Sequence, residues 1–450
     1  MAQEHKCNVD RYTTAGAKSG RRQPERSTHP SPSKTAHAIR SLLARKVGAK
    51  PRASWPSAPG IALLLMAATG CTKHSDTVPM TRAHWQTTGT DAVFLTPKDS
   101  PQGVLQLQRG SAELKDLQFS DGTIDFDIGL VGHGIVGIRF RERDPHNADV
   151  FYLRPQPNCS TSFDCIQYMP LEHGAYEWDL FPQYEAAAPI HPNDWNHIRM
   201  HVDGRRMQVF VNGSASPTLS VDDMEGPASS GSIVLHGPAS FRNFKVTPAS
   251  PAPTATPSAA AEPLPAGFIR NWQVSAPVRE LTSTDPALQA PVGDPPAYTS
   301  MPAGSAAWRS ISAEPQGLVN LSREVGSKPD GSATSLVWLQ TTLDSDRDQR
   351  KQVHLGWVRE IWVYSNGRLV HADRNLYGLP AASKSPDGRF SLQNGSFSLP
   401  LHKGHNQLAI AIDDNLPGNT QHFGWGFAMR FDDPSGVTAL THSPAATSPQ

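Results

Sequence analysis

The chain has 450 residues, and its 41 lysines and arginines balance its 41 aspartates and glutamates. The balance hides a basic N-terminal segment, because residues 1–70 hold 12 Lys and Arg against 3 Asp and Glu, which leaves a net charge of −9 from Cys71 onward. A mildly acidic chain of this kind excludes the phosphate neutralisation on which nucleic-acid binding rests.

An apolar run from Ile61 to Gly70 ends directly before Cys71, and Lys50 and Arg52 lie upstream of it. A basic flank, an apolar segment too short to span a bilayer, and small residues before a cysteine are the layout of a bacterial lipoprotein signal. A short buried helix is the alternative for a run of this length. We favour the signal, which predicts a lipid on Cys71 and a protein tethered in the cell envelope.

The segment before Cys71 is longer than the roughly 15–30 residues of an ordinary export signal. Residues 1–70 are therefore interpreted as a disordered leader plus signal peptide, with Val47 as a candidate for the true start. Residues 71–88 would form the anchor and tether. Because Thr72 rather than aspartate follows the cysteine, similarity to bacterial sorting signals implies the outer membrane.

Residues 89–247 show short alternating runs with turn signals between them. Apolar and polar residues alternate at period two, and Asp203-Gly204 is typical of a hairpin turn; the clearest runs are 122–129, 137–141, 151–154, 195–202 and 206–211. Helical periodicity is nearly absent. The pattern predicts an all-β sandwich.

Cys159 and Cys165 are the two cysteines inside this unit. In an oxidising compartment an isolated pair favours one disulfide that closes a short loop. Half of a metal site is the competing interpretation, but no His or Cys is spaced to complete it.

Residues 248–266 are rich in proline and alanine and predict an extended linker. Residues 267–438 return to strand patterns, with Asn366-Gly367 as a hairpin turn, and predict a second β-sandwich of jelly-roll type. Residues 439–450 are predicted to be a disordered tail. Four aromatic residues of the second unit are candidates for core packing or ligand contact: Trp357, Trp362, Tyr364 and Tyr377.

The segment Asp344-Ser-Asp-Arg-Asp348 gathers carboxylates, which calcium prefers as ligands. The turn glycine and closing glutamate of an EF-hand loop are missing, and Arg347, Arg350 and Lys351 offer salt-bridge partners. A solvated turn is favoured and calcium stays open; no other metal or cofactor is predicted.

The first unit resembles a concanavalin A-like lectin/glucanase domain, and more narrowly the bacterial domain grouped with 3-keto-disaccharide hydrolases. The resemblance covers nearly all of 89–247 and rests on Phe119–Ile128, Gly137–Arg141, Phe151–Pro155, Ile166–Tyr168, Trp195–Arg199 and Phe241–Val246. The second unit is similar to galactose-binding-like jelly rolls, best over 335–432. Together the resemblances imply a surface protein that handles carbohydrate.

Glycosidases on such sandwiches place two carboxylates across the bound sugar. The laminarinase-type Glu-x-Asp-x-Glu motif is missing, and Glu177-Trp-Asp179 is the nearest pair. The alternative for Glu177 and Asp179 is a solvated outer strand face. Elbow, zinc and phosphate-loop motifs are also missing, so the case for an enzyme from the sequence is weak.

Strand alternation gives a candidate ligand surface instead. If three strands are neighbours, five polar side chains share one face: Arg139, Arg141, Tyr152, Arg154 and Gln167. Tyrosine can stack on a sugar ring, glutamine can bond hydroxyls, and arginine can bind carboxylate or phosphate in a bidentate manner. The alternative is an ordinary solvated sheet face; the ligand interpretation favours an anionic glycan.

Three functions remain open. The first is a non-catalytic, lipid-anchored protein that binds polysaccharide through the first sandwich. The second is a glycoside hydrolase of the 3-keto-disaccharide type, and the third is an envelope scaffold that binds another protein.

Overall fold

The computed structural model describes residues 76–89, 91–131, 135–249, 264–281, 295–326, 334–414 and 423–440. These residues all belong to one compact unit of the chain. The predicted signal, Cys71, and most of the linker and tail lie outside the described residues. No helix within the described ranges is long and apolar enough to cross a membrane.

The first sandwich consists of two sheets, and every pairing between its named strands is antiparallel. Sheet A has the order β14 (Leu219–Val221), β13 (Arg206–Val211), β12 (Trp195–Asp203), β6 (Gly122–Leu130), β16 (Ala239–Pro248), β4 (Val104–Leu107) and β3 (Ala92–Leu95), with β1 (Asp76–Thr77) beside β16. Sheet B has the order β10 (Ala175–Tyr176), β9 (Ile166–Glu172), β8 (Asn147–Leu153), β7 (Val136–Asp144), β15 (Ser232–His236), β5 (Ser111–Leu114) and β2 (Trp85–Thr88), with β11 (Glu185–Ala186) beside β9. A 3₁₀ turn, η1 (Pro182–Tyr184), precedes β11.

Alternation along the strands builds the core between sheets A and B. On β6, Ile124, Phe126 and Ile128 are fully buried, while Asp125 and Asp127 take the intervening positions. Phe126 stacks on Phe244 with ring centres 5.9 Å apart. Burial of alternate apolar side chains on a pleated sheet is the expected source of stability.

The second sandwich is built around one long strand. The strands are β17 (Asn271–Ser275), β18 (Arg279–Leu281), β19 (Trp308–Ser312), β20 (Val319–Asn320), β21 (Thr334–Ser345), β22 (Gln349–Ser365), β23 (Arg368–Asn375), β24 (Gly395–Leu401), β25 (Gly404–Asp413), β26 (Gly426–Phe431) and β27 (Val437–Leu440). The helical pieces are η3 (Tyr298–Ser300), η4 (Ser305–Ala307), η5 (Pro315–Gly317) and α1 (Leu321–Val325). The first half of β22 pairs with β24 and β26, and its second half pairs with β23 and β25.

Arg359 marks the point where β22 passes from one set of partners to the other. Its φ is 84°, a left-handed conformation that a side chain other than glycine rarely adopts. The surrounding strands hold it there, and its guanidinium is fully buried. A strained conformation at a buried arginine indicates that this side chain is placed for a specific contact.

The nearly all-β architecture confirms the predicted fold class. Both predicted hairpins form. β22 and β23 flank Asn366-Gly367 as predicted, whereas Asp203 pairs with Arg206 as the last residue of β12, so that turn is Gly204-Arg205, one residue later than predicted. Asn366 and Gly367 have φ values of 50° and 79°, as a type I′ turn requires. Trp357, Trp362 and Tyr364 are buried, which confirms core packing for Trp362.

Candidate functional site

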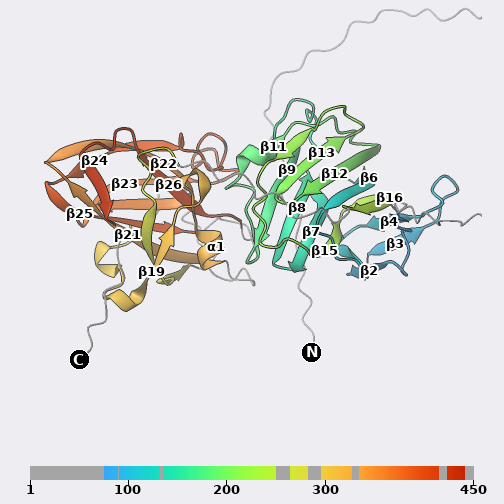
Figure 1. The fold of residues 1–450 in the computed structure, drawn as a ribbon, viewed down its shortest axis with the longest axis horizontal. Coiled ribbons are helices and arrows are strands. Elements are labelled where there is room, and N and C mark those ends of the chain that lie inside the picture. Colours follow the sequence, from blue (N-terminus) through green and yellow to red (C-terminus); the bar gives the residue numbers. More distant parts are fainter. Residues whose placement is uncertain are drawn as a thin grey trace, which may run out of the picture. The chain divides into compact units, whose positions relative to one another are not determined.

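The predicted ligand residues of β8 and β9 come together on the outer face of sheet B. Strands β7, β8 and β9 are neighbours (Figure 1), and Tyr152 lies opposite Gln167. The Tyr152 hydroxyl donates to Gln167 Oε1, and Gln167 Nε2 donates to the Trp178 carbonyl at 2.7 Å. Tyr152 and Gln167 are buried, so these hydrogen bonds hold both side chains in fixed positions on the sheet.

The two arginines of β7 that were predicted as ligand residues differ in where they point. Arg139 lies opposite Val150 on β8 and pairs with Glu142 at 2.8 Å. Arg141 does not join the group: it has a φ of 49° and lies at an irregularity in the β7–β8 register. Its guanidinium bonds Asp121 and the Gly204 carbonyl, at 2.9 and 2.8 Å. A bulge of this kind interrupts the alternation on which the shared surface was predicted.

Arg154 belongs to a cluster that the second sandwich completes. We define the aromatic–arginine cluster as Arg154, Trp178, Tyr377 and Arg389. The guanidinium of Arg154 lies 5.7 Å from the Trp178 ring centre and 5.8 Å from that of Tyr377; for Arg389 the distances are 5.2 and 5.4 Å. Cation–π contacts at this range hold two cations against two rings.

Carboxylates inside the chain neutralise both arginines of the cluster. Asp164 lies 3.5 Å from Arg154 and 3.8 Å from Arg389, and Glu185 lies 2.7 Å from Arg389. Because each cation already has an acidic partner, the arginines do not by themselves make this surface selective for anions.

Phe163 precedes Asp164, the acidic partner of this cluster, on the short loop between the two cysteines. The predicted disulfide between Cys159 and Cys165 is confirmed, with Cα atoms 5.3 Å apart. Phe163 is 74% exposed, and the next residue, Asp164, accepts a hydrogen bond from Ser162 Oγ at 2.7 Å. The loop is therefore closed covalently and braced by Asp164, while its aromatic ring faces solvent.

Glu177 and Asp179, the candidate catalytic pair, lie neither on a strand nor on a solvated face. β10 ends at Tyr176, and both carboxyl groups are fully buried. Asn320 Nδ2 donates to Glu177 Oε2 at 2.8 Å, and Arg359 Nη2 donates to Asp179 Oδ2 at 2.7 Å. The expectation of a solvated face fails because both acids meet partners from residues 267–438, which periodicity within 89–247 cannot reveal.

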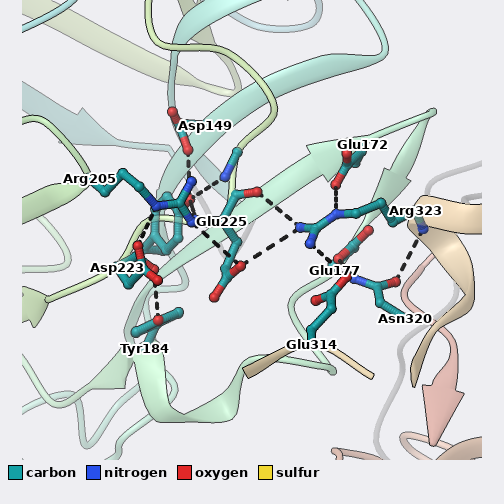
Figure 2. Close-up of polar contacts among 12 residues, drawn as sticks. Asp149, Glu172, Glu177, Tyr184, Arg205, Asp223, Glu225, Glu314, Asn320 and Arg323 are labelled. Carbon is teal, nitrogen blue, oxygen red and sulfur yellow. Dashed lines mark hydrogen bonds and ion pairs between the residues drawn. The ribbon is translucent and has the colours of Figure 1, made fainter. Parts of the chain in front are cut away.

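Arg323 gathers three more carboxylates around one guanidinium. Figure 2 shows it pointing toward Glu172, Glu225 and Glu314, and its nitrogens lie 2.6, 3.8 and 2.7 Å from their carboxylate oxygens. Glu172 and Glu225 belong to the first sandwich, whereas Arg323 and Glu314 belong to the second. We call this group the Arg323 clasp; it joins the two sandwiches.

Burial raises carboxyl pKa values in the Arg323 clasp, because one guanidinium cannot balance three carboxylates. Burial, opposed by Arg323, raises the pKa of Glu314 to about 7. Burial also raises the pKa of Glu225, and that of neighbouring Glu177 well above its usual range. The clasp consequently holds protons at pH values where exposed glutamates have lost them.

The three aspartates of the segment 344–348, predicted as a solvated turn or a calcium site, make polar contacts with other residues of the chain. Asp344 lies 3.4 Å from His405, Asp346 lies 3.3 Å from Arg347, and Asp348 accepts from the Lys403 backbone at 2.7 Å. Within the described part of the chain, no group of three or more His, Cys, Asp or Glu side chains could hold a metal ion.

Comparison with known families gives one match. Residues 81–247 match a 3-keto-alpha-glucoside-1,2-lyase-like domain. The matched range spans nearly the whole first sandwich and agrees with the resemblance found in its sequence. No curated protein matches the chain.

Solved structures provide fold-level likenesses. A carbohydrate-binding module from Bacillus subtilis is 16% identical, with a TM-score of 0.28, over 38% of this chain and 97% of its own. A beta-glucanase from Bacillus licheniformis is 11% identical, with a TM-score of 0.28, over 40% and 100%. Domain 4 of an extracellular arabinanase from Geobacillus stearothermophilus, solved with arabinotriose, is 13% identical, with a TM-score of 0.26, over 36% and 81%.

Sequence reasoning missed the residues that close the site from the second sandwich. Arg323, Arg359 and Arg389 carry no motif, and each bonds a partner in the first sandwich that lies more than 100 residues away. Phe163 did carry a signal, since an aromatic residue between two paired cysteines is held in a short loop with little room to bury it.

Proposed function

We propose that this protein is a non-catalytic, glycan-binding lipoprotein of the bacterial cell envelope. Its anchor is the lipid on Cys71, with the outer membrane as its destination. The glycan binds the first sandwich at the edge formed by Phe163 and the aromatic–arginine cluster. This assignment keeps the sequence-based proposal of carbohydrate binding and moves its contacts toward the loop of Cys159 and Cys165.

The observation that carries the proposal is the exposed ring of Phe163 on a braced loop. An aromatic face fits the apolar face of a pyranose, and a loop that is already ordered loses little entropy on binding. The next residue, Asp164, and its partner Arg154 have side chains that are 24% and 14% exposed, so they offer acceptors and donors to sugar hydroxyls. Tyr377, partly exposed, accepts from Arg154 at 3.2 Å and extends the surface.

One further point supports a glucoside as the ligand, and another supports binding without cleavage. The family model that matches the first sandwich is described by an alpha-glucoside, which makes glucosides the first class to test. Glu177 and Asp179 are buried and bonded to Asn320 and Arg359, which withdraws this acid pair from contact with a glycosidic bond.

Replacing Phe163 with serine is expected to weaken glucan binding about tenfold, since stacking of ~1.4 kcal/mol is lost. The melting temperature should hardly change, because the ring is 74% exposed. Val93→Ser is the matched control, as Val93 is an apolar residue of sheet A that is 43% exposed. Calorimetric titration of the purified full chain with gluco-oligosaccharides measures the affinity. Equal affinity in Phe163→Ser and wild type would contradict the proposed site, and a product in the mixture would favour the hydrolase.

The anchor is tested separately in cells. Wild-type protein should incorporate a labelled fatty acid and sediment with outer membranes, because a lipid at one cysteine is the attachment that the signal provides. Cys71→Ala should lose both the label and the membrane association. Cys7→Ala, which alters a cysteine of the leader, is the control and should behave as wild type. A label that persists in Cys71→Ala would refute the anchor.

A further inference from the structure

A pocket opens on the outer face of sheet A, which is the other sheet of the first sandwich. It is lined by His197 and Arg199 of β12, Phe210 of β13, and Gly213 and Ser214 of the turn that follows. Alternation along β12 directs Ile198 and Met200 into the core, so His197 and Arg199 point outward. Arg199 lies opposite Phe210 in the β12–β13 register, which places a cation beside a partly buried ring.

The positive charge at this pocket exceeds the negative charge beneath it. His197 lies 2.9 Å from Asp127 and 3.6 Å from Asp125, and Arg199 lies 2.6 Å from Asp125. Arg242 of β16 shares Asp127 at 3.3 Å. Hydrogen bonds that the His197 ring donates to Asp125 and Asp127 raise the pKa of His197 to about 9, so the imidazole is charged at neutral pH. Three cations thus share two carboxylates.

The cations of the pocket are exposed, unlike those of the aromatic–arginine cluster. The side chains of Arg199 and His197 are 56% and 42% exposed, and they keep donor capacity for an incoming acid group. Ser214 adds a hydroxyl, which donates to the Ser216 carbonyl at 2.8 Å and can accept from a ligand. Gly213 is exposed with a φ of 73°, and a Cβ there would meet nothing within 4 Å, so the space beside it is open to a ligand.

The surplus of one positive charge selects the ligand. A ring face at Phe210, two exposed cations and a hydroxyl match a sugar residue that carries one acid group. A long polyanion such as nucleic acid is disfavoured, because the chain from Cys71 onward has a net charge of −9. A neutral sugar would leave the surplus positive charge unbalanced, because Asp125 and Asp127 are shared among three cations.

We propose that this pocket is a second saccharide site, which binds an acidic sugar residue bearing a carboxylate or a sulfate. The site lies on the opposite sheet from the loop of Phe163 and does not depend on it. Arg199 and His197 bind the acid group, and Phe210 contacts the sugar ring. One protein could then hold a neutral glycan and an acidic glycan at once.

The test is a calorimetric titration of the full chain with oligogalacturonate, hyaluronan and chondroitin sulfate fragments, and with neutral galacto-oligosaccharide. The expected result is at least tenfold tighter binding of an acidic fragment than of the neutral one, weakened by added salt because the ion pairs are exposed. Whether uronate or sulfated fragments bind tighter identifies the acid group.

Arg199→Ala should lose at least tenfold in affinity for that fragment, and Phe210→Leu should also weaken binding. Arg206→Ala, an exposed arginine of β13 outside the pocket, should bind as wild type. Phe163→Ser should also bind it as wild type, which separates this site from the proposed glucan edge. Equal binding of acidic and neutral fragments, no acidic binding, or an unaffected Arg199→Ala would overturn the proposal.

Discussion

Replacing Arg359 with methionine is expected to lower the free energy of unfolding by about 3–5 kcal/mol, the cost of leaving a buried charge unpaired. Arg359 and Asp179 are both fully buried, 2.7 Å apart, and they join the two sandwiches. Burial raises the pKa of Asp179, and Arg359 opposes that rise. Without Arg359 the carboxyl must take up a proton or stay charged among apolar groups. Urea unfolding followed by tryptophan fluorescence measures the loss.

The matched control removes both charges. Asp179→Asn combined with Arg359→Met should unfold within about 1 kcal/mol of wild type, since an uncharged pair pays no desolvation. Methionine and arginine face the same backbone strain at a φ of 84°, so the comparison isolates the charge. A single variant that loses less than about 1 kcal/mol, or a double variant as unstable as the single one, would show that an unpaired charge on Asp179 is not the cause of the loss.

Replacing Arg323 with methionine is expected to destabilise the protein by about 3 kcal/mol at pH 8 and clearly less at pH 5. The guanidinium holds Glu172, Glu225 and Glu314, and without it their charges repel one another in a buried place. At pH 5 Glu314, whose pKa burial raises to about 7, holds a proton in the folded state, which relieves part of the repulsion. Urea unfolding of variant and wild type at both pH values measures the difference.

In the wild-type protein, the direction in which Glu314 changes stability with pH follows from its raised pKa. Its pKa is about 7 in the folded chain against 4.5 as the reference value, so the folded state holds more protons between these values. The contribution of Glu314 to stability is therefore greatest below pH 4.5, falls as pH rises toward 7, and is constant above. Arg309→Met, which breaks an exposed pair with Glu324, is the control and should cost at most about 1 kcal/mol at either pH. An equal loss for Arg323→Met at pH 5 and pH 8 would contradict the clasp.

Periodicity within the chain predicted the fold well, because alternation depends on neighbours along one strand. The runs at 122–129 and 206–211 became β6 and β13, and Asn366-Gly367 turned as its φ preferences require. The same alternation put Tyr152 and Gln167 on one face of neighbouring strands. It could not anticipate Arg141, whose positive φ redirects the side chain at an irregularity in β7.

The candidate site was harder to predict from the sequence, because its residues meet partners from distant segments of the chain. Glu177 and Asp179 follow a strand and alternate with Trp178, so the sequence alone favours a solvated face. Their burial depends on Asn320 and Arg359, which reach them from 143 and 180 residues away. The outward orientation of His197 and Arg199 could be predicted from the sequence, because the run from Trp195 to Val202 alternates between apolar and polar residues.

The most direct test of the account is a glycan array probed in parallel with the wild-type chain, Phe163→Ser and Arg199→Ala. We expect wild type to retain neutral glucans and acidic glycans, Phe163→Ser to lose the glucans, and Arg199→Ala to lose the acidic set. The same retention pattern for all three proteins would contradict both sites, and an array that retains nothing with wild type would contradict glycan binding itself.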